Sequence, residues 1–171
     1  MPYMPVSARL ACTTLLALGL VACSSRPPVA DRPSAGPAAQ PVRGGDPFQA
    51  TSVTIRALGL VGTPYRYGGN TPDSGFDCSG LVTYVFADML DLRLPRTSRE
   101  LARVQGPKIA PERLSSGDLV FFGSGADVWH VGIYVGEGRF VHAPSSGGTV
   151  RLDALSNPYW QRHYSGAKRV L

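Results

Sequence analysis

The order of two apolar patterns most strongly constrains the fold of this chain. After Cys78, apolar residues recur with helical spacing, which predicts a helix from Cys78 to about Leu90. From residue 118 onward, the apolar residues instead occur in short segments that are typical of strands. Helices that precede strands in the chain are typical of an α+β fold with an antiparallel sheet. We therefore predict N-terminal helices packed on a central antiparallel sheet.

Capping and turn residues set the bounds of the other expected elements. Asp46 offers an N-cap and Pro47 suits the first helical position, so a first helix is predicted over about residues 47–61. Residues 65–75 are rich in Gly, Asn, Pro and Asp and predict a loop, and residues 97–105 predict a short helix. The remaining expectations are an inner face of the first helix made by Ile55, Leu58 and Val61, and strands at residues 118–122, 130–135, 139–143, 149–152 and 168–171.

The first 45 residues carry signals of export rather than of a folded core. Arg9 precedes an apolar stretch, residues 10–21, that is too short to span a bilayer and is typical of a signal peptide. The stretch ends in Leu-Val-Ala-Cys at residues 20–23, which resembles the lipobox of bacterial lipoproteins, whose cysteine is acylated; a plain signal peptide is the alternative. We predict a signal peptide at 1–22, a lipidated Cys23 with a Pro-rich tether at 23–45, and one domain at 46–171.

The cysteine count directs attention to Cys78. Of the three cysteines, processing would remove Cys12 and block Cys23, so Cys78 would have no disulfide partner in an oxidising compartment. A cysteine in the first turn of a helix feels the positive end of the helix dipole, which predicts a lowered thiol pKa and a reactive thiolate. A buried and inert cysteine is the alternative interpretation.

Two histidines follow Cys78 in segments that resemble strands. If residues 136–138 form a three-residue turn, Gly132 lies opposite His142, and His130 becomes a diagonal neighbour of His142 on the same face. A two-residue turn would place the two histidines on opposite faces. We predict that Cys78 attacks a carbonyl carbon, that His130 is the general base, and that His142 orients His130.

The cysteine and the two histidines could alternatively bind a metal ion. A zinc site made by the cysteine and the two histidines would have three ligands and no paired-cysteine spacing, so no metal is predicted. His163 is predicted to be structural.

The formal charge is +5, but the basic residues form no run, which argues against nucleic acid and fits anionic partners such as cell-wall polymers or anionic lipids.

Several segments, in order, resemble the NlpC-type family of cell-wall cysteine peptidases, a branch of the papain-like fold, and especially its lipoprotein murein endopeptidases. The resemblance covers about residue 50 to the end of the chain. The matching segments are TPYRYGG at 63–69, FDCSGLV at 76–82, LPRTS at 94–98, GDLVFF at 117–122, HVGIY at 130–134, FVHA at 140–143, PYW at 158–160 and AKRVL at 167–171.

The resemblance implies hydrolysis of peptidoglycan stems or crosslinks, at D-alanyl–diaminopimelate or γ-D-glutamyl–diaminopimelate bonds, with no cofactor. By family position Cys78, His130 and His142 are the catalytic set, and the hydroxyl of Tyr65 joins the Cys78 N–H at the oxyanion. Ser79 would line the cleft, while Asp77 would cap the helix. Arg66, Arg96 and Arg99 flank the expected cleft and are predicted to bind the carboxylates of the stem.

The expected setting is the bacterial cell envelope, with the protein lipid-anchored to the outer membrane on its periplasmic side. Peptidoglycan, the membrane and adaptor proteins are the expected partners. Two alternatives stay open: a non-catalytic peptidoglycan-binding lipoprotein on the same fold, and an amidase or transacylase that uses the same residues.

Overall fold

The computed structural model describes residues 46–146 and 148–171. The predictions for the signal peptide, for Cys23 and for the tether lie outside the described residues. Within them, no helix has both the length and the apolar character that crossing a membrane requires. In chain order, the elements are α1 (Pro47–Gly59), β1 (Asn70–Thr71), β2 (Gly75–Phe76), α2 (Cys78–Leu90), α3 (Ser98–Leu101), the 3₁₀ helix η1 (Pro111–Arg113), β3 (Leu119–Ser124), β4 (Asp127–Gly136), β5 (Arg139–His142), β6 (Arg151–Ala154), α4 (Pro158–His163) and β7 (Tyr164–Lys168).

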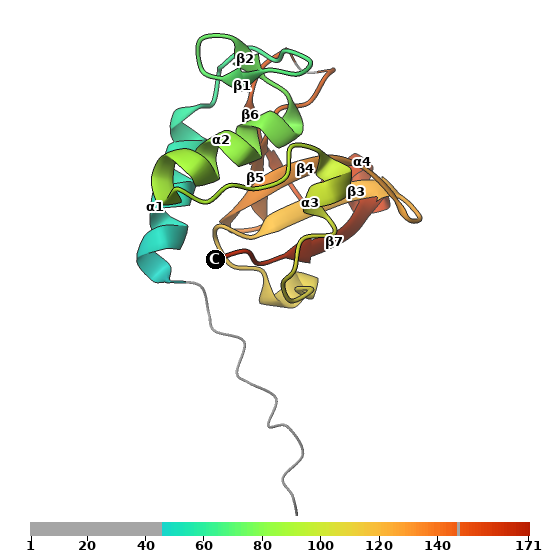
Figure 1. Ribbon diagram of the computed structural model, residues 1–171. Helices are drawn as coiled ribbons and strands as arrows, with labels where there is room; N and C mark the ends of the chain where they lie inside the picture. The colour runs from blue at the N-terminus through green and yellow to red at the C-terminus, as the bar shows by residue number, and fades with distance from the viewer. Residues whose placement is uncertain (1–45, 147) are drawn as a thin grey trace, which may run out of the picture. The chain divides into compact units, whose positions relative to one another are not determined.

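A five-stranded sheet lies at the centre of the domain, and its strand order is β6-β5-β4-β3-β7. Every neighbouring pair in this sheet is antiparallel. Helices α1 and α2 precede it in the chain, and Figure 1 shows both of them beside the sheet. The predicted α+β fold with N-terminal helices on an antiparallel sheet is therefore confirmed.

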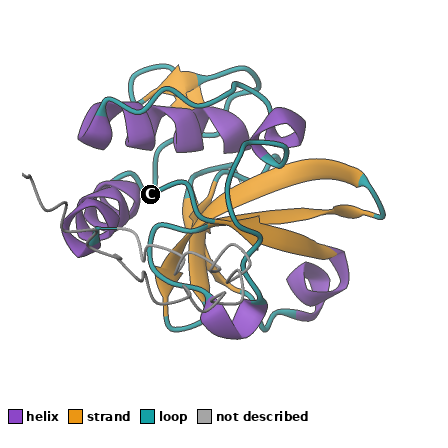
Figure 2. Cartoon of the chain, turned by 60° about the horizontal axis from the view of Figure 1, so that its bottom comes forward, coloured by secondary structure: helices purple, strands orange, loops and turns teal. Residues whose placement is uncertain are grey.

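The two faces of the sheet pack against different elements. Side chains alternate along a strand, so Val131 and Ile133 of β4 face the α1 and α2 side, whereas Tyr134 faces α4. The larger core lies between the long helices and the sheet, and the smaller core forms around Trp160 of α4. Figure 2 shows the two long helices at one side of the strands and shorter helices elsewhere around them. This division leaves a second, aromatic layer behind the sheet.

Helix α1 begins as predicted but buries a different face. The side chain of Asp46 accepts a hydrogen bond from the Phe48 N–H, and Pro47 occupies the first turn. The buried residues are Val53, Ala57 and, just after the helix, Leu60. The predicted inner face of Ile55, Leu58 and Val61 is wrong, because these three side chains are 66%, 41% and 46% exposed. The smaller Val53 and Ala57 allow α1 to lie close to its neighbours.

Helix α2 carries the predicted apolar face and the predicted start. Its N-cap is Asp77, whose side chain accepts from the Gly80 N–H. The buried apolar residues are Leu81, Val82, Val85 and Phe86. Gly80 is required at this point of the helix, since an added Cβ would lie 2.0 Å from the carbonyl oxygen of Gly69. The start of α2 is thus held firmly against the loop that precedes it.

Several elements differ from the sequence expectations. The third helix is four residues long, Ser98–Leu101, and its N-terminus is stabilised by a capping box between Thr97 and Glu100. The last strand lies earlier than predicted, at Tyr164–Lys168, where it pairs with β3. The predicted 65–75 loop contains a small β1–β2 ladder, and the helices η1 and α4 were not predicted. Pro111 and Pro158 begin these short helices, a position that favours proline.

Candidate active site

Cys78 is the first residue of α2 and faces the sheet. It is a free cysteine of intermediate exposure that packs against the larger core. The backbone N–H groups of Val131, Ser79 and Cys78 itself surround its sulfur. The N-cap Asp77 lies directly before it, so the backbone turn that starts the helix also positions the thiol.

The thiol does not show the lowered pKa that its helix position predicts. Burial raises the pKa of the Cys78 thiol and the charge of Asp77 raises it further, whereas the surrounding N–H groups lower it. The prediction considered the helix dipole alone and omitted desolvation, which disfavours the thiolate. The uncharged thiol is therefore the resting form, and its reaction requires a base within the site.

The β4–β5 pairing brings the two histidines to one face by a route that differs from the prediction. The turn contains two residues, Glu137 and Gly138, and Gly136 pairs with Arg139. A two-residue turn alone would put the histidines on opposite faces, but the register shifts between Tyr134 and Gly136. This bulge restores the parity, so that Ile133 pairs with Val141 and both histidines lie on the α4 side.

The histidines are in direct contact and buried. His130 Nε2 and His142 Nδ1 are 2.9 Å apart, and His142 Nε2 lies 3.0 Å from Asp153 Oδ2. Burial lowers the pKa of His130 to about 3, and the charges of His142 and Arg151 act in the same direction. Burial also lowers the pKa of His142 to about 4, despite the opposing effect of Asp153. Both rings are thus neutral at pH 7, and the contact with Asp153 is a hydrogen bond from an uncharged imidazole.

Aromatic side chains hold the His130 ring. Trp160 stacks on it with a centroid distance of 5.3 Å and an interplanar angle of 19°. The ring centroids of Phe122 and His130 are 6.0 Å apart, and Trp160 lies edge-on to His142 with a centroid distance of 4.9 Å. The Trp160 N–H also donates to Asp153 Oδ2 over 2.8 Å. This packing limits rotation of both imidazoles and excludes water from their far side.

Cys78 and His130 open into one cleft of about 310 Å³. Tyr65 reaches the cleft from the loop before β1. Burial raises the pKa of the Tyr65 hydroxyl, and the nearby Cys78 raises it further, so the hydroxyl stays protonated and able to donate. The cleft is lined by Tyr65, Cys78, Trp129, His130, Ala143, Pro144, Ser145, Ser146, Arg151, Asn157, Tyr159 and Trp160.

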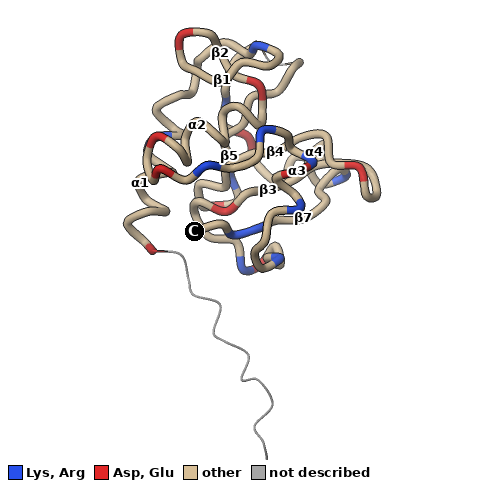
Figure 3. Tube along the Cα trace, viewed as in Figure 1, with Lys and Arg blue, Asp and Glu red and all other residues tan. Residues whose placement is uncertain are grey.

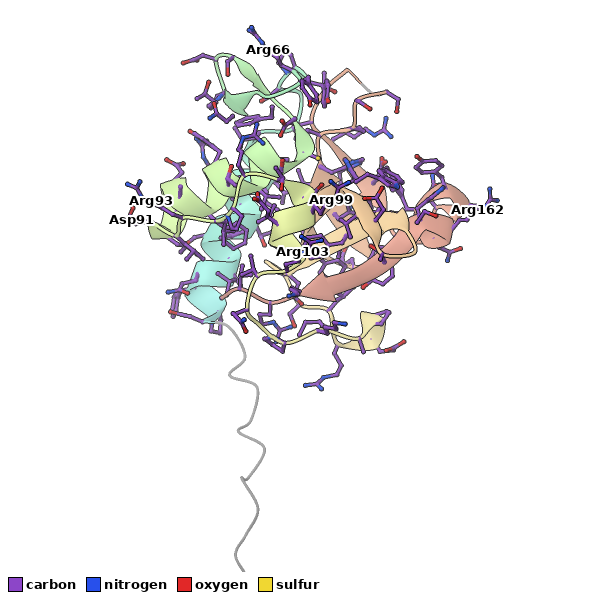
Figure 4. The ribbon with its side chains drawn as sticks, turned by 45° about the vertical axis from the view of Figure 1, so that its right-hand side comes forward. Arg66, Asp91, Arg93, Arg99, Arg103 and Arg162 are labelled. Carbon is purple, nitrogen blue, oxygen red and sulfur yellow. The ribbon has the colours of Figure 1, made fainter. Side chains whose placement is uncertain are left out.

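The residues predicted to bind substrate lie elsewhere. Arg96 donates to both carboxylate oxygens of Asp77 over 2.8 Å and to the Ser79 hydroxyl over 2.9 Å. Ser79 is buried within this cluster. Arg66 is exposed and extends outward from the β1–β2 end of the molecule in Figure 4, and Arg99 forms an exposed ion pair with Asp127. None of these four predicted residues is among those that line the cleft.

Arg151 and Asp153 were not recognised from the sequence, and Trp160 was noted only within the matching segment at 158–160. Arg-Leu-Asp at residues 151–153 follows the strand alternation, which places Arg151 and Asp153 on one face and Leu152 on the other. The β5–β6 register then pairs His142 with Arg151 and Phe140 with Asp153. The alternation was visible in the sequence, but the register across the intervening loop was not.

The described part of the chain contains no group of three or more His, Cys, Asp or Glu side chains placed to hold a metal ion. The zinc alternative therefore has no ligand set there. The nitrogens of His130 and His142 that face each other are already engaged in one hydrogen bond. The arrangement instead provides a thiol, an adjacent neutral imidazole and a hydroxyl donor around one cleft, which is the equipment of nucleophilic acyl transfer.

Comparisons with known proteins agree with this geometry. Residues 62–169 match the model of the NlpC/P60 family. The chain is 46% identical over 129 residues to the murein DD-endopeptidase MepH of Escherichia coli K12, covering 72% of this chain and 47% of that protein. It is also 47% identical over 111 residues to the probable endopeptidase NlpC of the same strain, covering 64% and 70%. The chain spans about half the length or less of the first curated relatives that it matches.

Solved structures show the same fold. An NlpC/P60 family protein from Bacillus cereus superposes with a TM-score of 0.67 at 31% identity, covering 71% of this chain and 40% of that chain. RipD from Mycobacterium tuberculosis, described as a non-catalytic NlpC/p60 domain protein adapted to peptidoglycan binding, gives a TM-score of 0.61 at 27% identity, covering 72% and 98%. The family match covers more than half of the sequence. The chain belongs to the NlpC/P60 family.

Proposed function

We propose that the chain is a cysteine endopeptidase that hydrolyses peptide stems or crosslinks of peptidoglycan. One observation carries this proposal: the Cys78 thiol and the neutral His130 ring open into the same cleft, and His130 is held by His142. The similarity to proteins named as murein endopeptidases supports the choice of substrate. The scissile bond would be D-alanyl–diaminopimelate or γ-D-glutamyl–diaminopimelate.

In the first half of the proposed reaction, His130 takes the proton of the Cys78 thiol as the sulfur attacks the scissile carbonyl carbon. The new C–S bond converts the carbonyl oxygen into an oxyanion, which the Cys78 N–H and the Tyr65 hydroxyl would stabilise. The protonated His130 then gives its proton to the leaving amine as the C–N bond breaks. A thioester between Cys78 and the acyl part of the substrate remains.

In the second half, His130 takes a proton from water as the water oxygen attacks the thioester carbon. Collapse of the second tetrahedral intermediate breaks the C–S bond, and the sulfur recovers its proton from His130. The raised thiol pKa suits this scheme, because proton transfer to His130 accompanies attack and a separate thiolate is not stored.

The cleft also suggests which cation meets the substrate. Among the described residues that line it, Arg151 is the one Lys or Arg, and its side chain is 41% exposed. Peptide stems carry carboxylates, which arginine binds with good geometry. We therefore propose that Arg151 binds the stem carboxylate, the role that was predicted for Arg66, Arg96 and Arg99.

The experiment is mass spectrometry of muropeptides after incubation of purified sacculi with the full chain and, in parallel, with Cys78→Ala. Conversion of crosslinked dimers into monomers by the intact protein alone would support a crosslink-cleaving endopeptidase. Shortened stems would place the cut at the γ-D-glutamyl bond. Equal digestion by Cys78→Ala would overturn the proposed mechanism.

The alternative is a non-catalytic peptidoglycan-binding protein on the same fold, for which RipD is described as an example. Its discriminating result is that both proteins sediment with sacculi and neither changes the muropeptides. The charge pattern does not favour nucleic acid in either case, since Figure 3 shows basic and acidic residues interspersed along the described chain.

We also propose that Cys23 is lipidated and that the domain works in the cell envelope, tethered to the outer membrane on its periplasmic side. The lipobox-like residues 20–23 support this location. Adaptor proteins are further expected partners. Metabolic labelling with a palmitate analogue tests the lipid: the full chain should be labelled and Cys23→Ala should not. Recovery of Cys23→Ala in the same membrane fraction as the full chain would contradict a lipid anchor.

A further inference from the structure

A single carboxylate oxygen, Asp153 Oδ2, is hydrogen-bonded to His142, Trp160 and Arg151. Asp153 Oδ2 lies 3.0 Å from His142 Nε2 and 2.8 Å from Trp160 Nε1. The Nε and Nη2 groups of Arg151 approach the same oxygen at 3.2 and 3.0 Å. The Asp153 side chain is 20% exposed, and His142 is fully buried.

The chemistry of these partners fixes where the protons are. The indole N–H of Trp160 and the guanidinium of Arg151 can only donate, so the shared oxygen accepts. Burial alone would raise the pKa of Asp153, but the hydrogen bonds from Trp160 and Arg151 and the charge of Arg151 hold that pKa below its usual range. An ionised carboxylate cannot donate, and therefore His142 Nε2 carries the proton of that hydrogen bond.

The proton assignment passes from one ring to the next. His142 is neutral at pH 7, so a proton on Nε2 leaves Nδ1 with its lone pair. His142 Nδ1 then accepts across the 2.9 Å contact, and His130 Nε2 must donate. A neutral His130 protonated at Nε2 has its lone pair on Nδ1, the nitrogen that is not used by His142.

We propose that Asp153 is a positioning residue that sets the tautomer of both histidines and so keeps the basic nitrogen of His130 free for the Cys78 thiol. Arg151 and Trp160 hold the carboxylate oxygen in place, and Trp160 also stacks on the His130 ring. Asp153 is not among the residues that line the cleft, and it acts through His142. Its effect on rate rests on the proposed function, whereas its effect on the tautomers does not.

Charge balance around the histidines gives Asp153 a second role. The ionisable groups that face the pair are Arg151 and Asp153 from β6 and, across the cleft, Cys78 at the start of α2. The charges of Arg151 and Asp153 oppose each other, so the resting site holds no net charge beside the rings. When His130 accepts the thiol proton, the carboxylate behind His142 stabilises the new cation through the intervening ring.

Two variants separate orientation from charge. Asp153→Asn keeps an oxygen that the N–H groups of Trp160 and Arg151 orient toward themselves, but it has no negative charge. Asp153→Ala removes the acceptor altogether. Asp88→Ala is the matched control, because Asp88 also pairs with an arginine, Arg56, at 2.7 Å on the helices α1 and α2.

The first readout is the ¹⁵N spectrum of the histidine side chains in the labelled full chain. We expect both His130 and His142 to be protonated at Nε2 in the unaltered protein, in Asp153→Asn and in Asp88→Ala. In Asp153→Ala, the His142 signals should move to values averaged between the two tautomers. A proton on Nδ1 of His142 in the unaltered protein, or an unchanged spectrum in Asp153→Ala, would overturn the proposal whether or not the protein cleaves peptidoglycan.

The second readout is the pH profile of kcat on the peptidoglycan substrate. Asp153→Ala should lower kcat by about 10- to 100-fold with KM changed much less, since a misplaced base costs that order of rate. Asp153→Asn should recover most of the rate at high pH but little at low pH, where the missing negative charge matters most. Equal rates for Asp153→Ala and Asp88→Ala would overturn the role in catalysis while leaving the proposed function standing.

Discussion

Two aspartate–arginine pairs in this domain use their carboxylates in opposite ways. Asp118 gives both oxygens to Arg169, at 2.7 and 2.9 Å, and one of them also accepts from the Ser115 N–H. Asp153 places Arg151, Trp160 and His142 on one oxygen. Among the described residues, the carboxylate of the first pair bonds only to Arg169 and to the backbone of the adjacent loop at Ser115. The second is directed at a ring that contacts the candidate base.

The comparison shows how to separate a structural ion pair from a functional one. The Asp118 and Arg169 side chains are 1% and 11% exposed, and neither residue lines the cleft. The Asp153 cluster is less buried, yet it connects through His142 and His130 to the thiol side of the sheet. Burial alone would rank Asp118 first. The direction of the hydrogen bonds instead supports the role proposed for Asp153.

The largest loss of rate should come from His130, which the contacts of Asp153 reach through His142. His130→Ala is expected to lower kcat on peptidoglycan by about 10²–10⁴-fold, because it removes the proposed general base. Circular dichroism should show an unchanged fold, since Trp160 and Phe122 still pack together at 4.7 Å. Arg139→Gln, at an exposed ion pair on β5, is the matched control for general damage. Loss of less than twofold in His130→Ala would assign the base to another group.

Acid should destabilise the histidine side of the comparison. An unfolded histidine has a pKa near 6.5, whereas the folded values are about 3 for His130 and about 4 for His142. Below pH 6.5 these histidines are therefore protonated in the unfolded chain but stay neutral in the folded chain. The free energy of unfolding consequently decreases as the pH falls. Between pH 7 and 4.5, the two rings together should reduce the free energy of unfolding by roughly 4–5 kcal/mol.

Urea unfolding at pH 7, 5.5 and 4.5 measures this effect. His142→Asn should show about half of the loss, because one of the two titrating rings is gone. The lowered pKa values of Asp153 and Asp77 act in the same sense but at lower pH, near and below 4. An identical pH dependence in His142→Asn would mean that the buried rings are not the source.

The fold was largely predictable because its apolar pattern is local. The α2 helix and the β3 to β5 strands follow from spacing within single segments. The inner face of α1 was wrong because the larger Ile55 was preferred to Val53 and Ala57, although close helix packing favours small side chains. The start of β7 was missed because its Tyr-Ser-Gly sequence at 164–166 lacks an apolar alternation.

The site was predictable as far as single strands allow. The side-by-side placement of His130 and His142 follows from a short hairpin, although a bulge that the sequence does not announce was needed to produce it. Asp153 lies beyond a loop, and its register with β5 is set by tertiary packing. The thiol pKa depends on burial, which a helix-start position does not reveal. The catalytic roles of these residues stay predictions.

The Asp118 pair should appear in stability rather than in rate. Arg169→Gln leaves the fully buried carboxylate of Asp118 without its cation, which should reduce the free energy of unfolding by about 3 kcal/mol. At temperatures well below its melting point, the variant should retain kcat. Denaturation and turnover measured on the same preparation test both statements, and a rate loss larger than the loss of folded protein would contradict them.

The smallest expected change in the free energy of unfolding is at a third ion pair, Arg99–Asp127, which tests whether solvent exposure determines how much such a pair contributes. Arg99 and Asp127 are 2.7 Å apart, but both side chains are 60% exposed. Water screens such a pair and holding two long side chains costs entropy, so Arg99→Gln should change the free energy of unfolding by less than about 0.5 kcal/mol. Urea unfolding at low and high salt measures it. A loss similar to that of Arg169→Gln would mean that contact distance, rather than burial, governs these pairs, and the contrast between Asp118 and Asp153 would then need another explanation.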